Sequence, residues 1–224
     1  MKKRNFITGA SSFIFTGLYP VVSMAENAST YFSLIWRGLD VGFSNIKLKR
    51  SGKKITANIE VKISVKVLNF DAFSYNLKNE EIWEAGVLTK IKSKTIIGKK
   101  TEFVKGERKN KGFQIEGSKF SGFVKGNPAT TSYFSPDFLK RKIWISTQDG
   151  DPLSVNANKI GPDMAKSVDG EIPATLWKIS GDLDLELLYG KDGEWLGSRF
   201  YAGGSQAEFL LKQSVGNMHS LWKV

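Results

Sequence analysis

Residues 55–67 read ITANIEVKISVKV, an unbroken alternation of apolar and polar side chains. Ile, Ala and Val occupy every odd position, and Thr, Asn, Glu, Lys and Ser occupy the even ones. Successive side chains of a β-strand point to opposite faces, so this period of two predicts a long strand with one dry and one wet face. Such strands usually belong to a large antiparallel sheet.

Strand patterns extend outward from this stretch in both directions. Upstream, strands are expected at residues 31–36 and 41–50, with a turn at 37–40. Downstream, strands are expected at 73–84, 87–98, 101–107 and on to 125, and again at 175–180, 182–189, 194–201 and 206–212. Turns that mostly contain glycine separate these strands, so the first half of the chain is predicted to be a meander of consecutive hairpins.

Two segments depart from the strand pattern. Ser135 followed by Pro136 predicts one short helical turn through Leu139, because Ser caps helices and Pro suits the first helical position. The Gly-, Pro- and Asp-rich stretch 158–173 predicts a long loop.

The fold class follows from the number of strands. About a dozen strands in one chain are rarely accommodated by a flat open sheet without curling or closing. We therefore expect an all-β fold, namely a large, antiparallel, strongly curved sheet or incomplete barrel with one short helical turn. The expected organisation is a signal peptide at 1–25, a single β domain at 26–215 and a C-terminal tail at 216–224.

The first 25 residues have the layout of a secretory signal. The basic residues 2–4 precede an apolar stretch at 6–22, and Ser23-Met24-Ala25 offers small residues before a cut after Ala25. Several Gly and Ser residues and Pro20 interrupt the apolar stretch, which makes it a poor membrane span. We expect a periplasmic protein exported by the Sec route. A twin-arginine signal, which Lys3-Arg4 resembles, and an uncleaved anchor remain as alternatives.

Composition removes several chemistries. The chain has no cysteine, which excludes disulfides, thiolate metal ligands, a thiol nucleophile and a lipid anchor on cysteine. Its one histidine, His219, stands near the C-terminus, so a Ser-His-Asp triad or a zinc centre would have to be built around that residue. Because terminal segments are commonly poorly ordered, we expect His219 to be a solvated tail residue.

Charge is unevenly distributed along the chain. Removing residues 1–25 takes away three positive charges and no negative ones, so the formal net charge falls from +11 to +8. Lys90 to Lys111 contains nine basic residues against two acids, whereas residues 149–194 contain ten acids against four lysines. Export excludes nucleic acid as the partner and leaves an anionic membrane surface or an acidic protein. The alternative is that these lysines form the solvated face of a strand.

Six short motifs carry a resemblance to a known family. They are YFSLIWRGLDVG at 31–42, TSYF at 131–134, TQDG at 147–150, ISGDLDL at 179–185, DGEW at 192–195 and GGS at 203–205. Together they resemble exported bacterial proteins classed as the domain of unknown function 6134 and its relatives. Phe134 and Leu188 depart from the Trp that the family pattern has, while keeping apolar bulk. The resemblance implies a β-rich exported domain without an assigned activity, and the curved-sheet lipoprotein carriers are an analogy of fold only.

A curved sheet encloses a cavity lined by inward side chains, so the candidate site is apolar. The residues expected to contact a ligand are Trp83, Tyr133, Phe134, Phe138, Trp144 and Trp177. Further candidates for the lining are Trp36, Phe70, Phe73, Tyr75, Phe120, Phe123 and Trp195. Aromatic side chains also fill ordinary cores, so core packing is the alternative for each. Residues 133–139 are expected to cover the cavity, either as a lid or as a plug.

Three functions follow. The first is a non-catalytic periplasmic protein that binds or carries an apolar, lipid-like molecule. The second is a structural or protein-interaction module of the envelope with a filled core. The third is an enzyme that uses Tyr133, Asp137 or a buried carboxylate with a raised pKa as its acid or base.

Carboxylate pairs add little to these alternatives. Glu80 and Glu81 point to opposite faces of a strand, and we expect one solvated residue and one salt bridge there. The pairs Asp149/Asp151 and Asp182/Asp184 lack the ligand loop of a calcium site, so we expect neither a metal nor a cofactor.

Overall fold

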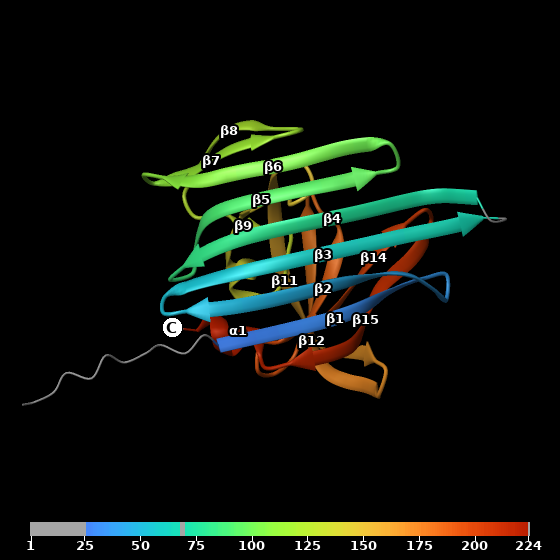
Figure 1. Ribbon diagram of the computed structural model, residues 1–224. Helices are drawn as coiled ribbons and strands as arrows, with labels where there is room; N and C mark the ends of the chain where they lie inside the picture. Colours follow the sequence, from blue (N-terminus) through green and yellow to red (C-terminus); the bar gives the residue numbers. More distant parts are fainter. Residues whose placement is uncertain (1–25, 68–69, 224) are drawn as a thin grey trace, which may run out of the picture.

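Figure 1 shows the computed structural model, which describes residues 26–67 and 70–223. The predicted signal peptide, residues 1–25, lies outside the described residues. The first half of the chain forms β1 (Glu26–Trp36), β2 (Leu39–Ser51), β3 (Lys54–Val67), β4 (Phe70–Glu84), β5 (Val87–Ile97), β6 (Lys100–Lys109), β7 (Gly112–Gly117) and β8 (Ser121–Lys125). The second half forms β9 (Ala129–Thr130), the 3₁₀ turn η1 (Pro136–Lys140), β10 (Ile143–Ile145), β11 (Pro152–Ser167), β12 (Gly170–Gly181), β13 (Leu185–Tyr189), β14 (Trp195–Ala202), β15 (Ser205–Val215) and the helix α1 (Met218–Trp222).

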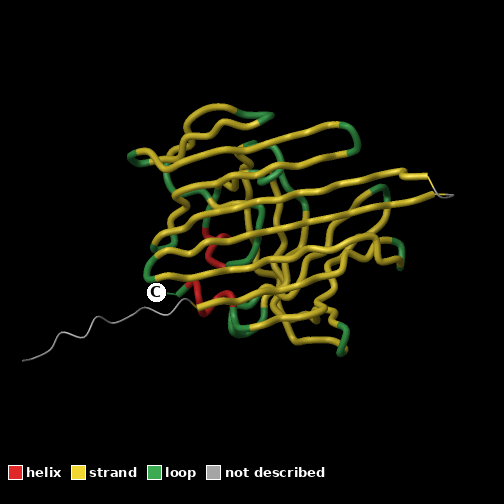
Figure 2. The backbone as a smooth tube through the Cα atoms, viewed as in Figure 1, coloured by secondary structure: helices red, strands yellow, loops and turns green. Residues whose placement is uncertain are grey.

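All fifteen strands belong to one sheet, in the order β8-β7-β6-β5-β4-β3-β2-β1-β15-β14-β13-β12-β11-β10-β9. Strand β1 pairs antiparallel with β15, so Ser29 lies opposite Val215. In Figure 1, β1 to β6 form a wide layer, and strands of the second half cross behind it. Figure 2 shows how far strands dominate the described chain. The predicted all-β fold with a large, strongly curved antiparallel sheet is confirmed, with somewhat more strands than expected.

The alternation at residues 55–67 decides which face of the sheet is buried. On β3, Ile55, Ala57 and Ile59 are buried, whereas Asn58 is exposed. Strand β4 continues the pattern, because Trp83 lies opposite Ile55. The odd-numbered residues of β3 and, from Phe73 onward, of β4 therefore share the concave, dry face.

Short turns with positive φ join the first hairpins, as the glycines predicted. Arg37 and Gly38 have φ of 51° and 76°, and Ala85 and Gly86 have 47° and 73°. Two consecutive residues with positive φ match the right-handed twist of the strands that they connect. The predicted helical turn at Ser135 is also present, since the Ser135 side chain accepts a hydrogen bond from the Asp137 amide.

The predicted loop at 158–173 is wrong. Strands β11 and β12 pair through this region, and the connection between Ser167 and Gly170 is only two residues long. Pro162 and Pro173 are accommodated within the hairpin, beyond a register shift between Lys159 and Gly161. A bulge is one of the few places where a sheet tolerates proline nearby.

The solvated C-terminal tail is also wrong. Helix α1 begins after Asn217, whose side chain accepts from the Ser220 amide, and His219 is only 7% exposed. The His219 ring packs against Gly193, where a side chain would collide with it. Burial lowers the pKa of His219.

Helix α1 completes an aromatic cluster, called here the plug, made of Trp83, Phe134, Phe138 and Trp222. Ring centroids lie 4.9 Å apart for Trp83 and Phe138, and 5.0 Å apart for Trp83 and Trp222. The Trp222 indole nitrogen donates to Asp137 Oδ2 at 2.8 Å, which ties α1 to η1. The plug fills the concave face at the end of the sheet that contains Ile55. Within the described part of the chain, no helix has the length and apolar character needed to cross a membrane.

Candidate functional site

The opposite end of the concave face is hollow. A cavity of about 630 Å³, called here the outer compartment, is lined by β1 to β5, β14 and β15 and the turn after β14. Trp36, Val65, Phe73 and Phe200 are among its apolar walls. Phe73 is 44% exposed, so apolar surface reaches solvent at this end. Leu39, on the adjoining hairpin, is exposed as well.

A second cavity of about 380 Å³, the inner compartment, continues toward the plug. Its apolar walls include Ile59, Val61, Leu77, Trp195 and Phe209. The two compartments have four lining residues in common, namely Ile63, Tyr75, Gln148 and Phe200. The compartments therefore adjoin each other, and we call them together the groove.

One side of the inner compartment is polar. This polar wall consists of Thr131, Ser132, Thr147 and Gln148, all from the loops that flank η1 and β10. The hydroxyls of Thr131 and Thr147 lie 3.0 Å apart, and the Thr147 amide donates to Thr131 Oγ1 at 3.0 Å. The polar wall is thus held in place by its own hydrogen bonds.

A buried carboxylate lies directly behind the polar wall. Glu81 is fully buried and accepts from Asn79 Nδ2 and Trp83 Nε1, each at 2.8 Å, and from Ser132 Oγ at 3.3 Å. Burial raises the pKa of Glu81 above its ordinary value, against the opposing effect of these donors. Among the described residues it has no ion-pair partner, so the expected salt bridge is wrong, while Glu80 is exposed. Position 81 shares the odd-numbered dry face with Trp83, which is the signal that could have located it.

The groove also contains two phenols. Tyr75 lines both compartments, and Tyr133 lines the inner one. Burial raises the pKa of both hydroxyls, so both stay neutral at physiological pH. Tyr133 has φ of 59°, and its carbonyl accepts from the Tyr189 hydroxyl at 2.8 Å. The Tyr133 ring packs against Trp195, with centroids 5.9 Å apart, while the next residue, Phe134, belongs to the plug.

The structure separates the six predicted contact residues. Tyr133 lines the groove, whereas Phe134, Phe138 and Trp83 belong to the plug. Trp144 is fully buried beside Tyr133, with ring centroids 5.7 Å apart. Trp177 is half-buried on β12 and lines neither compartment.

The further candidates divide in the same way. Trp36, Phe73, Tyr75 and Trp195 line the groove, and Phe120 and Phe123 do not. The side chain of Phe70 lies outside the described residues. Segment 133–139 is predicted to be either a lid or a plug over the cavity. It contributes Phe134 and Phe138 to the plug.

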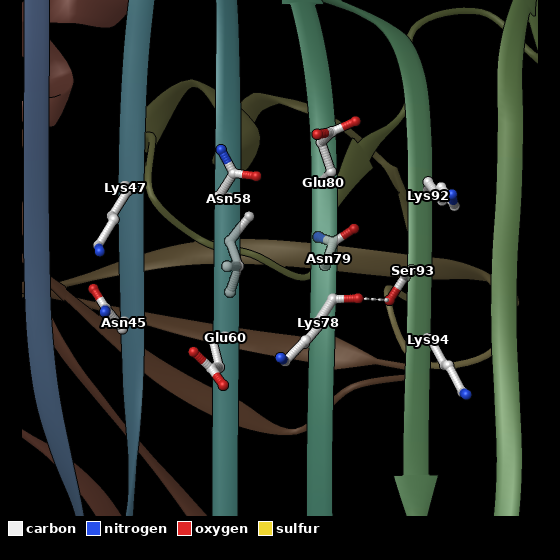
Figure 3. Close-up of a pocket in the computed structure, with 11 residues that line it drawn as sticks. Asn45, Lys47, Asn58, Glu60, Lys78, Asn79, Glu80, Lys92, Ser93 and Lys94 are labelled. Atoms are coloured by element: carbon white, nitrogen blue, oxygen red, sulfur yellow. Dashed lines mark hydrogen bonds between the residues drawn. The ribbon is translucent and has the colours of Figure 1, made fainter.

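The outer face of the same strands is charged. A depression of about 450 Å³ lies over β2 to β5. Figure 3 shows the side chains that line it, among them Lys47, Lys78, Lys92 and Lys94 together with Glu60 and Glu80. Lys78 lies directly opposite Lys94 across β4 and β5. Two residues of the basic stretch from Lys90 to Lys111 thus lie on this solvated face. No group of three or more metal-ligating side chains occurs among the residues that the structure describes.

Comparison with solved structures supports the fold. The chain is similar to the crystal structure of a beta-barrel-like protein of domain of unknown function DUF1849 from Brucella abortus, with a TM-score of 0.59 and 9% sequence identity. The similarity covers 84% of this chain and 97% of that one. At this identity the likeness concerns the fold alone.

Comparison of the sequence with known proteins gives a family. No curated protein matches the chain. A family model described as a domain of unknown function matches residues 32–212, which is most of the β domain and contains every residue of the groove. The chain therefore belongs to the DUF6134 family.

Proposed function

We propose that this protein is an exported, non-catalytic carrier that holds a lipid-like apolar molecule in the groove. The observation that carries the proposal is the pair of adjoining, mostly apolar compartments on the inner face of the sheet. Ligand sites are typically concave, mostly apolar and of this size, with a few polar groups that orient the ligand. The groove has all of these properties.

The direction of entry follows from the difference between the two ends. Trp83 and Phe134 close one end with fully buried rings. Phe73 is partly exposed at the other end and lines the outer compartment. A ligand therefore enters past Phe73 and stops before the plug.

The two alternatives are less well supported. A protein-interaction module needs no interior space, and the compartments give this protein such space. An enzyme needs an acid or base that reaches the substrate. Tyr133 lines the groove, but burial raises the pKa of its hydroxyl, which makes it a poor base at neutral pH. Glu81 is absent from the lining and approaches the groove only through Ser132.

Export and docking complete the proposal. The predicted signal peptide would deliver the carrier to the periplasm. The lysines on the outer face, such as Lys92 and Lys94, would bring it to an anionic membrane surface or an acidic protein.

Native mass spectrometry with lipid extraction tests the carrier function. The full chain is expressed and its exported form is purified. We expect a bound apolar molecule in the native protein. Val65→Trp, which narrows the outer compartment, should strongly reduce the bound mass, whereas the matched change Val168→Trp at a 51% exposed position should retain it. A folded native protein that carries no ligand and takes up no apolar dye would refute the proposal.

A further inference from the structure

The polar wall determines what kind of head group the groove accepts. The outer compartment is almost wholly apolar, whereas the polar side chains gather in the inner one. An amphipathic ligand would therefore place its head inside, at the polar wall, and its chain along the outer compartment toward Phe73.

Two side chains of the polar wall have their hydrogens engaged with acids. Ser132 Oγ donates to Glu81 Oε2 at 3.3 Å, and Gln148 Nε2 donates to Glu102 Oε2 at 2.7 Å. Ser132 Oγ also lies 2.6 Å from Thr130 Oγ1 and accepts from it, which leaves one lone pair of Ser132 and the Gln148 carbonyl oxygen for a ligand.

Ser132 and Gln148 consequently offer acceptors, while the Thr131 and Thr147 hydroxyls, 3.0 Å apart, keep one hydrogen between them that their own contact does not use. A hydroxyl head group, which both donates and accepts, complements this wall.

The charges around the groove also favour an uncharged head group. Within the described chain, no Lys or Arg lines either compartment. The acid of the lining, Asp184, is already paired with Lys178 at 2.5 Å, and Lys100 holds Glu102 from outside at 2.5 Å. Glu81 supplies no positive charge in either protonation state. A carboxylate or phosphate head would lose its hydration without gaining a cation.

We propose that the ligand is an uncharged amphipath with a hydroxyl head, of the long-chain alcohol or monoacylglycerol type, whose head donates hydrogen bonds to Ser132 and Gln148. This inference rests on the proposed carrier function and narrows its ligand class. It excludes free fatty acids and anionic phospholipids as the preferred cargo.

Competition for the groove tests the inference with two ligands of equal chain length. The neutral fluorescent probe N-phenyl-1-naphthylamine is bound first, and monopalmitoylglycerol and palmitate are then titrated at neutral pH below their aggregation thresholds. We expect monopalmitoylglycerol to displace the probe at a concentration about tenfold or more below that of palmitate, because an unpaired buried polar group is costly. Equal or better displacement by palmitate would overturn the inference while leaving the carrier function intact. Failure of the probe and of both ligands to bind would overturn the carrier function itself.

A variant of the polar wall shows whether the selectivity arises there. Gln148→Met removes the acceptor with little change of volume, and the preference should shrink to about threefold or less. Gln206→Met makes the same chemical change on the exposed part of β15 and should keep the full preference. If Gln148→Met does not fold, Ser132→Ala serves as the second variant, with the same expected loss of preference. An undiminished preference in a folded variant of either residue would refute the role of the wall.

Discussion

The two ends of the concave face use the same strands and the same alternation, yet one is solid and the other hollow. At one end Ile55 and Trp83 face each other under Phe134, Phe138 and Trp222. At the other end Val65 and Phe73 face each other across the same pair of strands and line a cavity. The difference lies in what covers them, because η1 and α1 reach only the first end. A dry face thus becomes core or binding site according to which distant segment packs on it.

The strongest test of this comparison is to replace one aromatic residue by alanine at each end of the concave face. Trp83→Ala should lower the free energy of unfolding by about 3–5 kcal/mol, because it leaves a cavity in a packed cluster. Phe73→Ala should cost about 1 kcal/mol or less, since that ring is partly exposed already. Urea denaturation of both variants measures the difference. Equal costs would mean that the open end is packed as tightly as the plug.

Glu81 lies where the plug meets the groove, so its variants probe the boundary. Glu81→Ala should lose at least about 2 kcal/mol more than Glu81→Gln, because it leaves the donors Asn79 and Trp83 without an acceptor. In Glu81→Gln, half a turn of the Asn79 amide would let its unpartnered Oδ1 accept from the new amide. Chemical denaturation at neutral pH compares the two variants, and similar losses would contradict the assigned hydrogen bonds.

The pH dependence of Glu81→Gln gives a second readout. Burial raises the folded-state pKa of Glu81 above the ordinary value of 4.5, so the folded protein binds this proton more tightly than the unfolded chain does. The resulting stability is fully present below pH 4.5 and is lost as the pH rises toward the raised pKa. The variant should therefore gain stability relative to the native protein as the pH rises above 4.5. Glu194, whose pKa burial also raises, remains in both proteins, so the slope should decrease without vanishing.

A more conservative variant tests which interaction holds α1 against η1. Trp222→Phe keeps an aromatic ring but removes the hydrogen bond to Asp137, and it should cost about 1 kcal/mol. Trp177→Phe is the control, because Trp177 is half-buried on β12 and lines neither compartment. It should lower the free energy of unfolding by less. Thermal unfolding followed by tryptophan fluorescence measures both. A cost no greater than that of the control would show that the hydrogen bond to Asp137 does not contribute to holding α1.

The smallest effect is expected on the charged, solvated face of β2 to β5, on the side of the sheet opposite the plug and the groove. Lys94→Glu should raise the free energy of unfolding by up to about 0.5 kcal/mol, because it replaces a like-charge pair with Lys78 by an opposite pair. The same variant should bind anionic vesicles less well than the native protein does. Urea titration and vesicle co-sedimentation measure these two results, and a loss of stability would contradict the cross-strand geometry.

Much of the fold could be predicted because local patterns encode strands and turns. The alternation at 55–67 located β3 and its buried face, and Ser135-Pro136 located η1. The hairpin of β11 and β12 was missed because Gly161, Pro162 and Pro173 outweighed a local cue, Asp169-Gly170, that is typical of tight hairpin turns. The overall composition of residues 158–173 favoured a loop, whereas the position of Asp169-Gly170 within that stretch determined the hairpin turn.

The site was harder to predict, because it depends on which distant segments meet. The sequence marked the aromatic residues but could not assign Trp83 to the plug and Tyr75 to the groove. Helix α1 had a local signal, since Met218, Leu221 and Trp222 share one helical face behind the cap Asn217. Glu81 could have been placed by its odd-numbered position alone. The four residues of the polar wall lie in the motifs at 131–134 and 147–150, but no local pattern shows that these two segments meet beside Glu81.

The pairing of β1 with β15 sets a condition on how this chain can fold. Ser29 finds its partner Val215 only after the residues between them have been synthesised, and contacts so distant in sequence slow folding. The hairpins from β1 to β8 can form as they emerge, but β1 keeps an unpaired edge until β15 follows. During that interval the free edge of β1 can pair with another chain, so the late arrival of β15 makes the growing sheet open to aggregation.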